Sequence, residues 1–191
     1  MKRIIIFLSF FILINFNIFA KEKFISFSAG ISSGFPLYGT NSVISTGNEL
    51  NNTNRIILGT LASININPIP QVSFFIGNDN LWDNTWNNYE HSSKLHICFP
   101  FGIKVYPGIG GFNLGLAYAL GFRYDNILTN TLGYYNNTSP WGNGFKIQLE
   151  YNFAHESQIN TLPSIGAHWY LMPRGNNSYD NLITLYIAAN F

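Results

Sequence analysis

The sequence predicts an all-β protein, an eight-stranded antiparallel up-and-down transmembrane β-barrel, and three observations support this fold class. Of the 191 residues, 47% are hydrophobic and only 10% are charged, whereas soluble domains carry roughly 25% charged residues. The hydrophobic residues alternate with small or polar ones, and this period of two is typical of strands with two different faces. After the N-terminal segment, no apolar run is long enough for a transmembrane helix. The composition therefore argues against a soluble enzyme with an ordinary solvated surface.

The charge balance and the single cysteine limit which partners and cofactors the protein can have. Ten basic and nine acidic residues give a formal net charge of +1, so no basic field favours nucleic acid, and we expect no nucleic-acid partner. The single cysteine, Cys98, excludes an intramolecular disulfide and a cysteine metal cluster. His91, His96, His155 and His168 share no metal-site spacing. We expect no metal and no cofactor.

Residues 1–20 have the pattern of a secretory signal peptide. Lys2 and Arg3 precede an apolar run over residues 4–13, and Ala20 offers a small residue at the cleavage position. The apolar run is shorter than the roughly 18 residues that a spanning helix needs. An uncleaved membrane anchor is the alternative. We expect cleavage after Ala20 and a barrel domain over residues 21–191.

Eight alternating segments follow the signal peptide. The clearest lies over 112–126, where every second residue from Phe112 to Phe122 is large and apolar and Gly, Ala and Asn fill the positions between them. The predicted strands lie near 24–37, 55–67, 71–78, 94–106, 112–126, 144–154, 162–172 and 181–191. Short turns at 68–70, 107–111 and 154–161 alternate with longer polar loops at 38–54, 79–93, 127–143 and 173–180. This asymmetry fits a transmembrane barrel with periplasmic turns and extracellular loops.

The sizes of the side chains decide which face points outward. A soluble barrel of lipocalin type would turn the apolar face inward, but an eight-stranded barrel has an interior just wide enough to be filled by side chains. Phe, Leu, Ile, Tyr and Trp on every strand would overfill it. Gly, Ser, Ala and Asn on the opposite face fit a narrow lumen. We therefore expect the apolar face to meet lipid.

The signal peptide, the eight strands, the unequal loops and the final Phe191 resemble the small OmpA/OmpX-type barrels of the bacterial outer membrane. The resemblance implies export through the cleaved signal peptide, a location in the bacterial outer membrane among its lipids, and the barrel-assembly machinery as a partner. It also implies an assembly signal at Leu185, Ile187 and Phe191. Ala189 departs from the aromatic residue often found at that position. The alternative is that Phe191 is one more lipid-facing residue.

Charged residues on the predicted inner face form a candidate lumen charge network. Its members are Lys104, Arg123, Asp125, Lys146, Glu150 and His168. Buried charges must be paired or hydrated, and Lys104 and Glu150 are expected at similar heights. We expect an ion-pair plug that fills and orders the lumen. A narrow solute path lined by the same charges is the alternative.

The predicted long loops hold a possible binding surface of aromatic residues. These are Trp82, Trp86, Tyr89, Tyr134, Tyr135 and Trp141. Aromatic side chains among Asn and Ser are typical of adaptable binding surfaces. The function favoured is a non-enzymatic structural or adhesin-like role towards an extracellular or host ligand, with a narrow porin-like channel as the first alternative. A lipid-modifying enzyme, suggested by residues 155–157 or 91–92, is the second.

Overall fold

The computed structural model describes residues 24–38, 50, 53–131, 133–155, 157, 162–173 and 179–191. The predicted signal peptide lies outside these residues. Among them are nine strands: β1 (Ile25–Leu37), β2 (Asn54–Ile69), β3 (Val72–Trp86), β4 (His91–Val105), β5 (Phe112–Thr129), β6 (Gly133–Thr138), β7 (Gly142–Asn152), β8 (Pro163–Pro173) and β9 (Tyr179–Asn190). No helix in the described part of the chain is long and apolar enough to cross a membrane.

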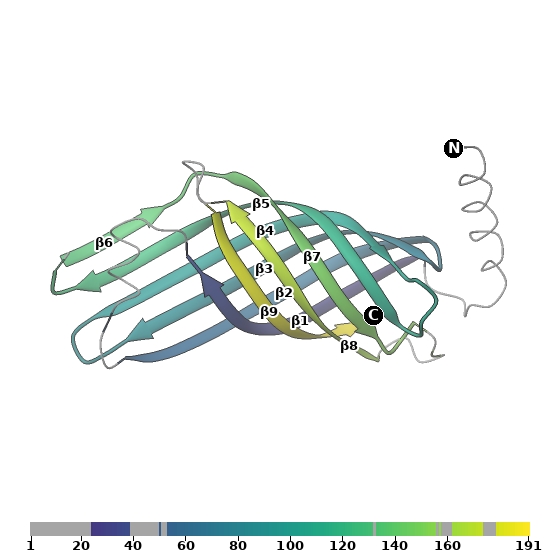
Figure 1. Cartoon of the computed structure of the whole chain (residues 1–191), viewed down its shortest axis with the longest axis horizontal. Coiled ribbons are helices and arrows are strands. Elements are labelled where there is room, and N and C mark those ends of the chain that lie inside the picture. Colours follow the sequence, from purple (N-terminus) through teal and green to yellow (C-terminus); the bar gives the residue numbers. More distant parts are fainter. Residues whose placement is uncertain are drawn as a thin grey trace.

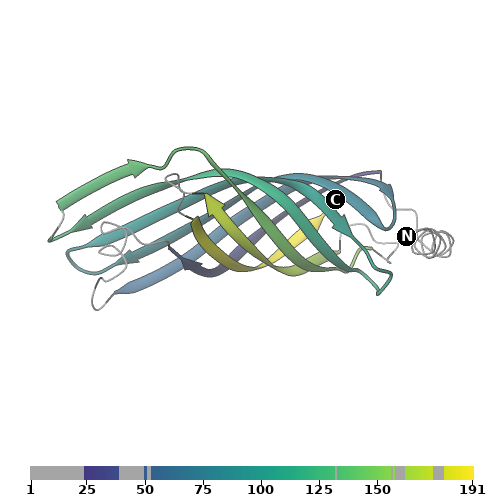
Figure 2. The ribbon, with the colours of Figure 1, turned by 45° about the horizontal axis from the view of Figure 1, so that its top comes forward.

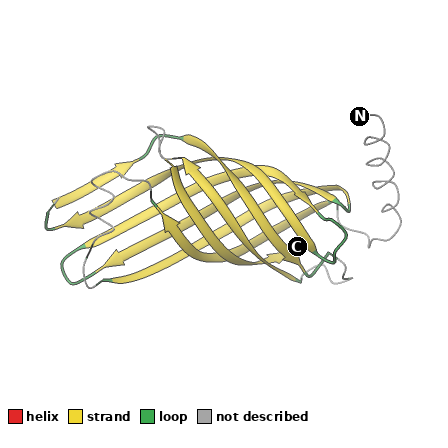
Figure 3. Ribbon diagram, in the orientation of Figure 1, coloured by secondary structure: helices red, strands yellow, loops and turns green. Residues whose placement is uncertain are grey.

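Eight of these strands close into an antiparallel barrel, which confirms the predicted fold class (Figures 1 and 3). Each barrel strand pairs with its neighbours along the chain, and β1 pairs with β9 to close the ring. The ninth strand, β6, pairs only with β5. It continues along the edge of β5 beyond the point where β7 leaves that edge.

A path that follows register partners once round the barrel returns to β1 ten residues from where it began. Following hydrogen-bonded partners from β1 round to β1 again passes through Ile25, Ile66, Phe74, Ile103, Leu116, Ile147, Trp169, Ile183 and Phe35. The displacement is 35 − 25 = 10 residues. Strands staggered in this way tilt by roughly 40° from the barrel axis. All nine side chains on this path are large, apolar and exposed, so they wind round the outside as a continuous hydrophobic surface.

The two ends of the barrel differ in height. Strands β2 to β6 extend well beyond the others at one end, named here the sheet end (Figures 1 and 2). The opposite end, the turn end, has tight connections such as residues 106–111, where Gly108 and Gly110 adopt positive φ angles of 82° and 56°. Only glycine adopts such angles without strain.

The predicted loops at 79–93 and 127–143 are wrong, because most of these residues are strand. β3 continues to Trp86 and β4 begins at His91, so only four residues connect them. The alternation persists through the polar stretch, since Asp79, Leu81 and Asp83 point inward. Pairing between the long hairpins satisfies their backbone groups. Asn and Asp, read as loop residues, here occupy strands.

Candidate functional site

The inner face of the barrel holds a layer of polar contacts near the turn end, centred on Glu150. Lys104 Nζ lies 3.1 Å from Glu150 Oε1, and Asn113 Nδ2 donates to the same oxygen at 2.9 Å. Gln148 Nε2 and the Tyr186 hydroxyl donate to Glu150 Oε2 at 3.2 and 2.6 Å. All five side chains are buried. Four donors therefore hold one carboxylate, which compensates its loss of hydration.

A glycine makes room for this layer. A Cβ atom on Gly166 would lie 2.5 Å from the Tyr186 ring, and also 2.6 Å from a backbone oxygen. Gly166 on β8 is the register partner of both Tyr186 on β9 and Glu150 on β7, so its missing side chain lets Tyr186 reach over β8 to Glu150. His168, a predicted member of the charge network, lies beside it and stacks on Tyr186 with 5.3 Å between ring centroids. It meets the edge of the Tyr170 ring at 4.9 Å, so it contributes to the lumen through ring contacts.

A second polar layer lies around Asp79. Lys146 Nζ is 2.9 Å from Asp79 Oδ2, and the Tyr170 hydroxyl donates to the same oxygen. Lys146 was predicted from the sequence, whereas its partner Asp79 was placed in a loop. The three residues come from β7, β3 and β8, so this contact crosses the lumen.

The third polar layer lies towards the sheet end. The Arg123 guanidinium contacts both oxygens of Asp125, at 2.6 and 2.8 Å, and also binds Asp180 of β9. His96 Nδ1 lies 4.0 Å from Asp180. The sequence predicted Arg123 and Asp125 for the lumen but placed Asp180 in a loop. One arginine thus bridges two carboxylates that lie on different strands, β5 and β9.

Tyr38, immediately after β1, covers this layer. Its hydroxyl donates to Asp83, which also pairs with Arg55 at 2.8 Å. Its ring stacks on His96 at 5.7 Å, and Lys94 Nζ lies 4.8 Å from the ring centroid. Burial, together with the Asp83 carboxylate, raises the pKa of Tyr38 well above its ordinary value. The phenol therefore stays protonated and remains a hydrogen-bond donor.

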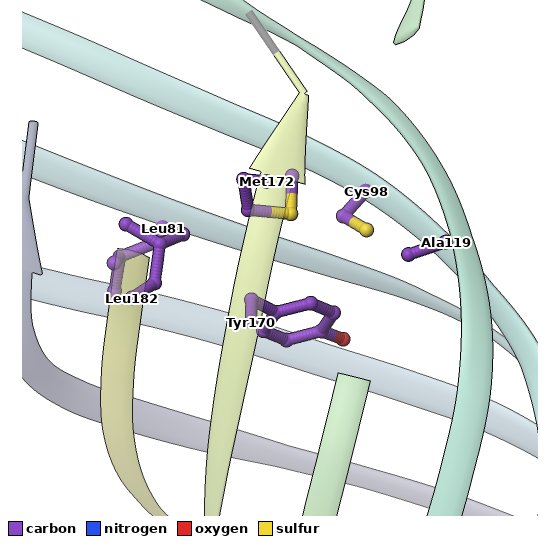
Figure 4. Packing of buried hydrophobic residues seen from close by; sticks show 6 residues of the cluster. All are labelled: Leu81, Cys98, Ala119, Tyr170, Met172 and Leu182. Atoms are coloured by element: carbon purple, nitrogen blue, oxygen red, sulfur yellow. The ribbon is translucent and has the colours of Figure 1, made fainter. Parts of the chain in front are cut away.

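An apolar plug lies between the second and third polar layers, and Figure 4 shows its six side chains. Its members are Leu81, Cys98, Ala119, Tyr170, Met172 and Leu182, all buried. Two cavities beside the plug and the Asp79 layer have volumes of about 20 Å³ each. Such a space holds about one water molecule. Among the described residues, the polar layers and the plug fill the lumen without leaving a wide path.

The turn end is covered by an aromatic contact. The rings of Tyr106 and His155 stack with centroids 4.0 Å apart, and both side chains are buried. A polar pocket of about 60 Å³ adjoins them. In the described residues, no three His, Cys, Asp or Glu side chains are grouped so that they could hold a metal ion.

The outer face of the extended strands forms a different kind of surface. One row of register partners contains Trp86, His91, Leu128 and Tyr134, from four adjacent strands. The neighbouring row contains Asn84, Ser93, Asn126 and Asn136. These eight residues, with Tyr89 in the β3–β4 turn, are named here the sheet-end surface. Aromatic side chains thus stand beside amides on strands of one sheet.

Hydrogen bonds connect the two rows. His91 Nε2 lies 2.9 Å from Asn126 Oδ1, and Asn126 Nδ2 donates to the Tyr134 hydroxyl at 3.1 Å. Within the second row, Ser93 Oγ donates to Asn84 Oδ1 at 2.6 Å. Tyr134 and Tyr89 remain 64% and 79% exposed. The side chains are therefore held in place while their aromatic faces stay accessible.

The six aromatic residues predicted as one loop surface separate into groups. Trp86, Tyr89 and Tyr134 belong to the sheet-end surface. Trp141 packs on Phe99 and Phe122 of the barrel wall, with centroid distances of 5.7 and 4.9 Å. Trp82 lies lower on the outer face of β3, and Tyr135 pairs with the inward-facing Ile127. His91 and Asn126 were not predicted as members, and they become visible only when the strands are aligned.

Comparison with known proteins shows which solved structures share this fold. No family model and no curated protein matches the sequence. The solved structure of Ail, the attachment invasion locus protein of Yersinia pestis, matches with a TM-score of 0.60 and 9% identity over 87% of this chain and 97% of Ail. The chain has the OmpA/OmpX-type barrel fold.

Two further solved structures match this OmpA/OmpX-type barrel with lower TM-scores. OprG from Pseudomonas aeruginosa matches with a TM-score of 0.43 and 8% identity over 87% of this chain and 95% of OprG. Neisserial surface protein A matches with a TM-score of 0.45 and 8% identity over 88% of this chain and 98% of that protein.

The predicted assembly signal of the OmpA/OmpX-type barrel lies on its outer wall. Leu185 and Ile187 are exposed on β9. Phe191 follows the end of β9, where its backbone N–H donates to Phe27 O at 2.8 Å and its carbonyl accepts from Phe27 N at 3.2 Å. The β1–β9 seam thus continues as far as Phe191. Recognition by the assembly machinery stays a prediction.

Proposed function

We propose that this chain is a non-enzymatic protein of the bacterial outer membrane that binds a macromolecule outside the cell through the sheet-end surface. The observation that carries the proposal is the row of Trp86, His91 and Tyr134 on strands that continue beyond the barrel wall. Trp86 is 12 residues beyond Phe74 on β3, which places it about 30 Å higher along the barrel axis. The apolar band of such barrels is only about 25 Å tall, so this row stands clear of the membrane.

The chemistry of the surface suits a large ligand. Aromatic rings supply contact area at a small entropy cost, and amides supply adaptable hydrogen bonds. The strands fix these groups before binding, which lowers the cost of ordering them. The name of Ail, an attachment protein, is consistent with such a role for a barrel of this fold.

The two alternatives have weaker support. A solute path would have to cross the plug of Met172, Leu81 and Leu182, beside cavities of only about 20 Å³. A lipid-modifying enzyme would need a reactive histidine. His155 is buried against Tyr106 at the turn end, and His91 is bonded to Asn126.

Adhesion of bacteria that express the protein tests the proposal. The strain would be a non-adherent laboratory bacterium, and the target a cultured epithelial monolayer. We expect the triple variant Trp86→Ala/Tyr89→Ala/Tyr134→Ala to reduce adhesion to the level of an empty vector. Tyr179→Ala, which removes an exposed tyrosine from β9, is the matched control and should adhere like the unaltered protein.

Heat-modifiable gel migration would show that every variant is folded and assembled. If the unaltered protein adheres no better than the vector, the adhesin-like role is rejected. Equal adhesion of the triple variant and the unaltered protein would reject the sheet-end surface as the binding site.

A further inference from the structure

Three polar side chains face outward on the barrel wall at β2 and β3. Asn80 Nδ2 donates to Asn78 Oδ1 at 2.7 Å and to Thr60 Oγ1 at 3.3 Å. Asn78 and Asn80 follow the exposed Ile76 and precede the exposed Trp82 on alternate positions of β3, while Asp79 and Leu81 between them point inward. The side chains of Thr60, Asn78 and Asn80 are named here the wall amide patch.

This patch lies at the depth of the hydrocarbon. Asn78 and Asn80 are four and six residues beyond Phe74 on β3, so they stand about 10 and 15 Å above it along the barrel axis. The apolar band is about 25 Å tall, and the exposed Ile76 and Trp82 on the same face of β3 lie below and above the two amides. On the other walls, β5, β7 and β9 present apolar side chains at similar heights, namely Leu116, Ile147 and Leu185.

The hydrogen bonds within the patch leave some of its donors and acceptors without a partner. An amide carries one acceptor oxygen and two donor hydrogens. Within the part of the chain that the structure describes, Asn80 Oδ1 and Asn78 Nδ2 have no hydrogen-bond partner. Lipid tails offer neither donors nor acceptors. Contact with a hydrogen-bonding surface is therefore favoured over contact with lipid.

A shallow groove of about 460 Å³ adjoins the patch on the same wall. Its floor consists of small residues, Ala29, Ala62 and Gly77, and its sides include Phe27, Ile64 and Ile76. Asn78 lies at its edge. Small residues let two protein surfaces approach closely inside a membrane.

We propose that a second copy of this chain covers the groove and the wall amide patch, forming a two-fold symmetric dimer in the membrane. Both copies of a membrane protein are inserted with the same orientation, so the two-fold axis runs along the membrane normal. The two copies of each residue then lie at the same depth, residues near the axis meet their own counterparts, and an amide both donates and accepts. Asn78 and Asn80 of the two copies satisfy one another, a match that an acyl chain does not provide. The proposal is independent of the extracellular binding role.

Cysteine cross-linking in lipid vesicles locates the contact. The background is Cys98→Ala, which removes the buried native thiol. Asn80→Cys is compared with Ile147→Cys, an outward position of similar depth on β7. On mild oxidation at low protein-to-lipid ratio, we expect the dimer band to appear with Asn80→Cys and to stay at background with Ile147→Cys. Equal cross-linking at both positions indicates random collision and overturns the proposal.

Energy transfer between labelled copies measures the affinity without a cysteine at the interface. The variant Asn78→Leu/Asn80→Leu replaces the amides by apolar side chains of similar size, which suit a lipid-facing wall and keep the barrel folded. We expect dimerisation to weaken about tenfold or more, with unchanged heat-modifiable migration.

Three further outcomes overturn the proposal. They are no energy transfer from the unaltered protein, unchanged transfer from the double leucine variant, and cross-linking of Asn80→Cys in native outer membranes to a different protein while purified protein stays monomeric.

Discussion

Within the lumen, the carboxylates and the cations described above are equal in number. The buried carboxylates belong to Asp79, Asp83, Asp125, Glu150 and Asp180, and the buried cations to Lys94, Lys104, Arg123 and Lys146, with the half-exposed Arg55 beside Asp83. Five carboxylates thus face five cations. A lumen of this width admits few water molecules, so pairing is the available way to compensate desolvation.

We expect Glu150→Leu to lower the free energy of unfolding by about 3–5 kcal/mol, because it leaves the Lys104 ammonium buried without its partner. It also removes the acceptor for Tyr186 and Asn113. Urea titration in lipid vesicles measures the loss. The double variant Lys104→Met/Glu150→Leu should be more stable than Glu150→Leu alone. Losses that simply add would show that the two side chains do not interact.

The sequence located part of this network and missed the rest for a definite reason. Lys104 and Glu150 lie in clearly alternating segments, so their shared face and height could be inferred. Asp79 and Asp180 lie where Asn, Asp and Gly obscure the alternation, and they were assigned to loops. The predicted lumen had three cations and two carboxylates besides His168. That imbalance was the signal that further carboxylates belonged there.

At the scale of the strands, alternation alone identified all eight barrel strands and their faces. It failed at their ends, since strands that rise beyond the membrane no longer need an apolar outer face. Asn84, Ser93 and Asn126 occupy outward positions there, and a search for alternating hydrophobicity stops before them. The sheet-end surface depends on register between four strands, which composition does not reveal.

The variant Leu116→Arg should destabilise the barrel far more than Ala117→Ser. Leu116 is exposed on the outer wall of β5 and Ala117 is buried on the inner face. An arginine on the lipid-facing wall costs about 2–4 kcal/mol near the membrane centre, whereas a hydroxyl in the lumen lies among polar side chains. Unfolding by urea in vesicles compares the two. Similar losses would contradict the assigned faces.

The substitution Phe191→Ala separates assembly from stability. It keeps the two backbone bonds with Phe27 and removes only the ring, whose burial is worth about 1.5–3 kcal/mol at most. We expect less assembled protein in the outer membrane of cells but near-normal refolding into detergent. Ile165→Ala, an exposed apolar residue on β8, is the control. If both variants assemble in cells like the unaltered protein, Phe191 is an ordinary lipid-facing residue.

For the molecule as a whole, the filled lumen indicates that the barrel has a structural role. The strands that extend beyond it indicate a binding role. Polar layers on both sides of the apolar plug fill the lumen, so the barrel serves as a rigid base for the extended strands. The extended strands β2 to β6 present their outer face above it. Function is therefore expected at the surface of the molecule and not along its axis.

Planar-bilayer recording tests this division. We expect the purified protein to give no discrete, reproducible conductance steps, because the plug and the ion pairs leave cavities of only about 20 Å³. Lys104→Ala and Lys146→Ala provide the controls. Stepwise currents whose size changes in either variant would identify a channel and reject the interpretation that the lumen is filled.

The pairing of the lumen charges also constrains how the chain folds. Asp79 of β3 meets Lys146 of β7, Lys104 of β4 meets Glu150 of β7, and Arg123 of β5 meets Asp180 of β9. Each bond joins residues distant in sequence, so none forms within a single hairpin. Such contacts form late, after long loops have closed. The charges can leave water only as the ring closes, so desolvation and closure belong to one cooperative event. A barrel halted before β9 would keep Arg123 without Asp180 and would hold an open, hydrated interior.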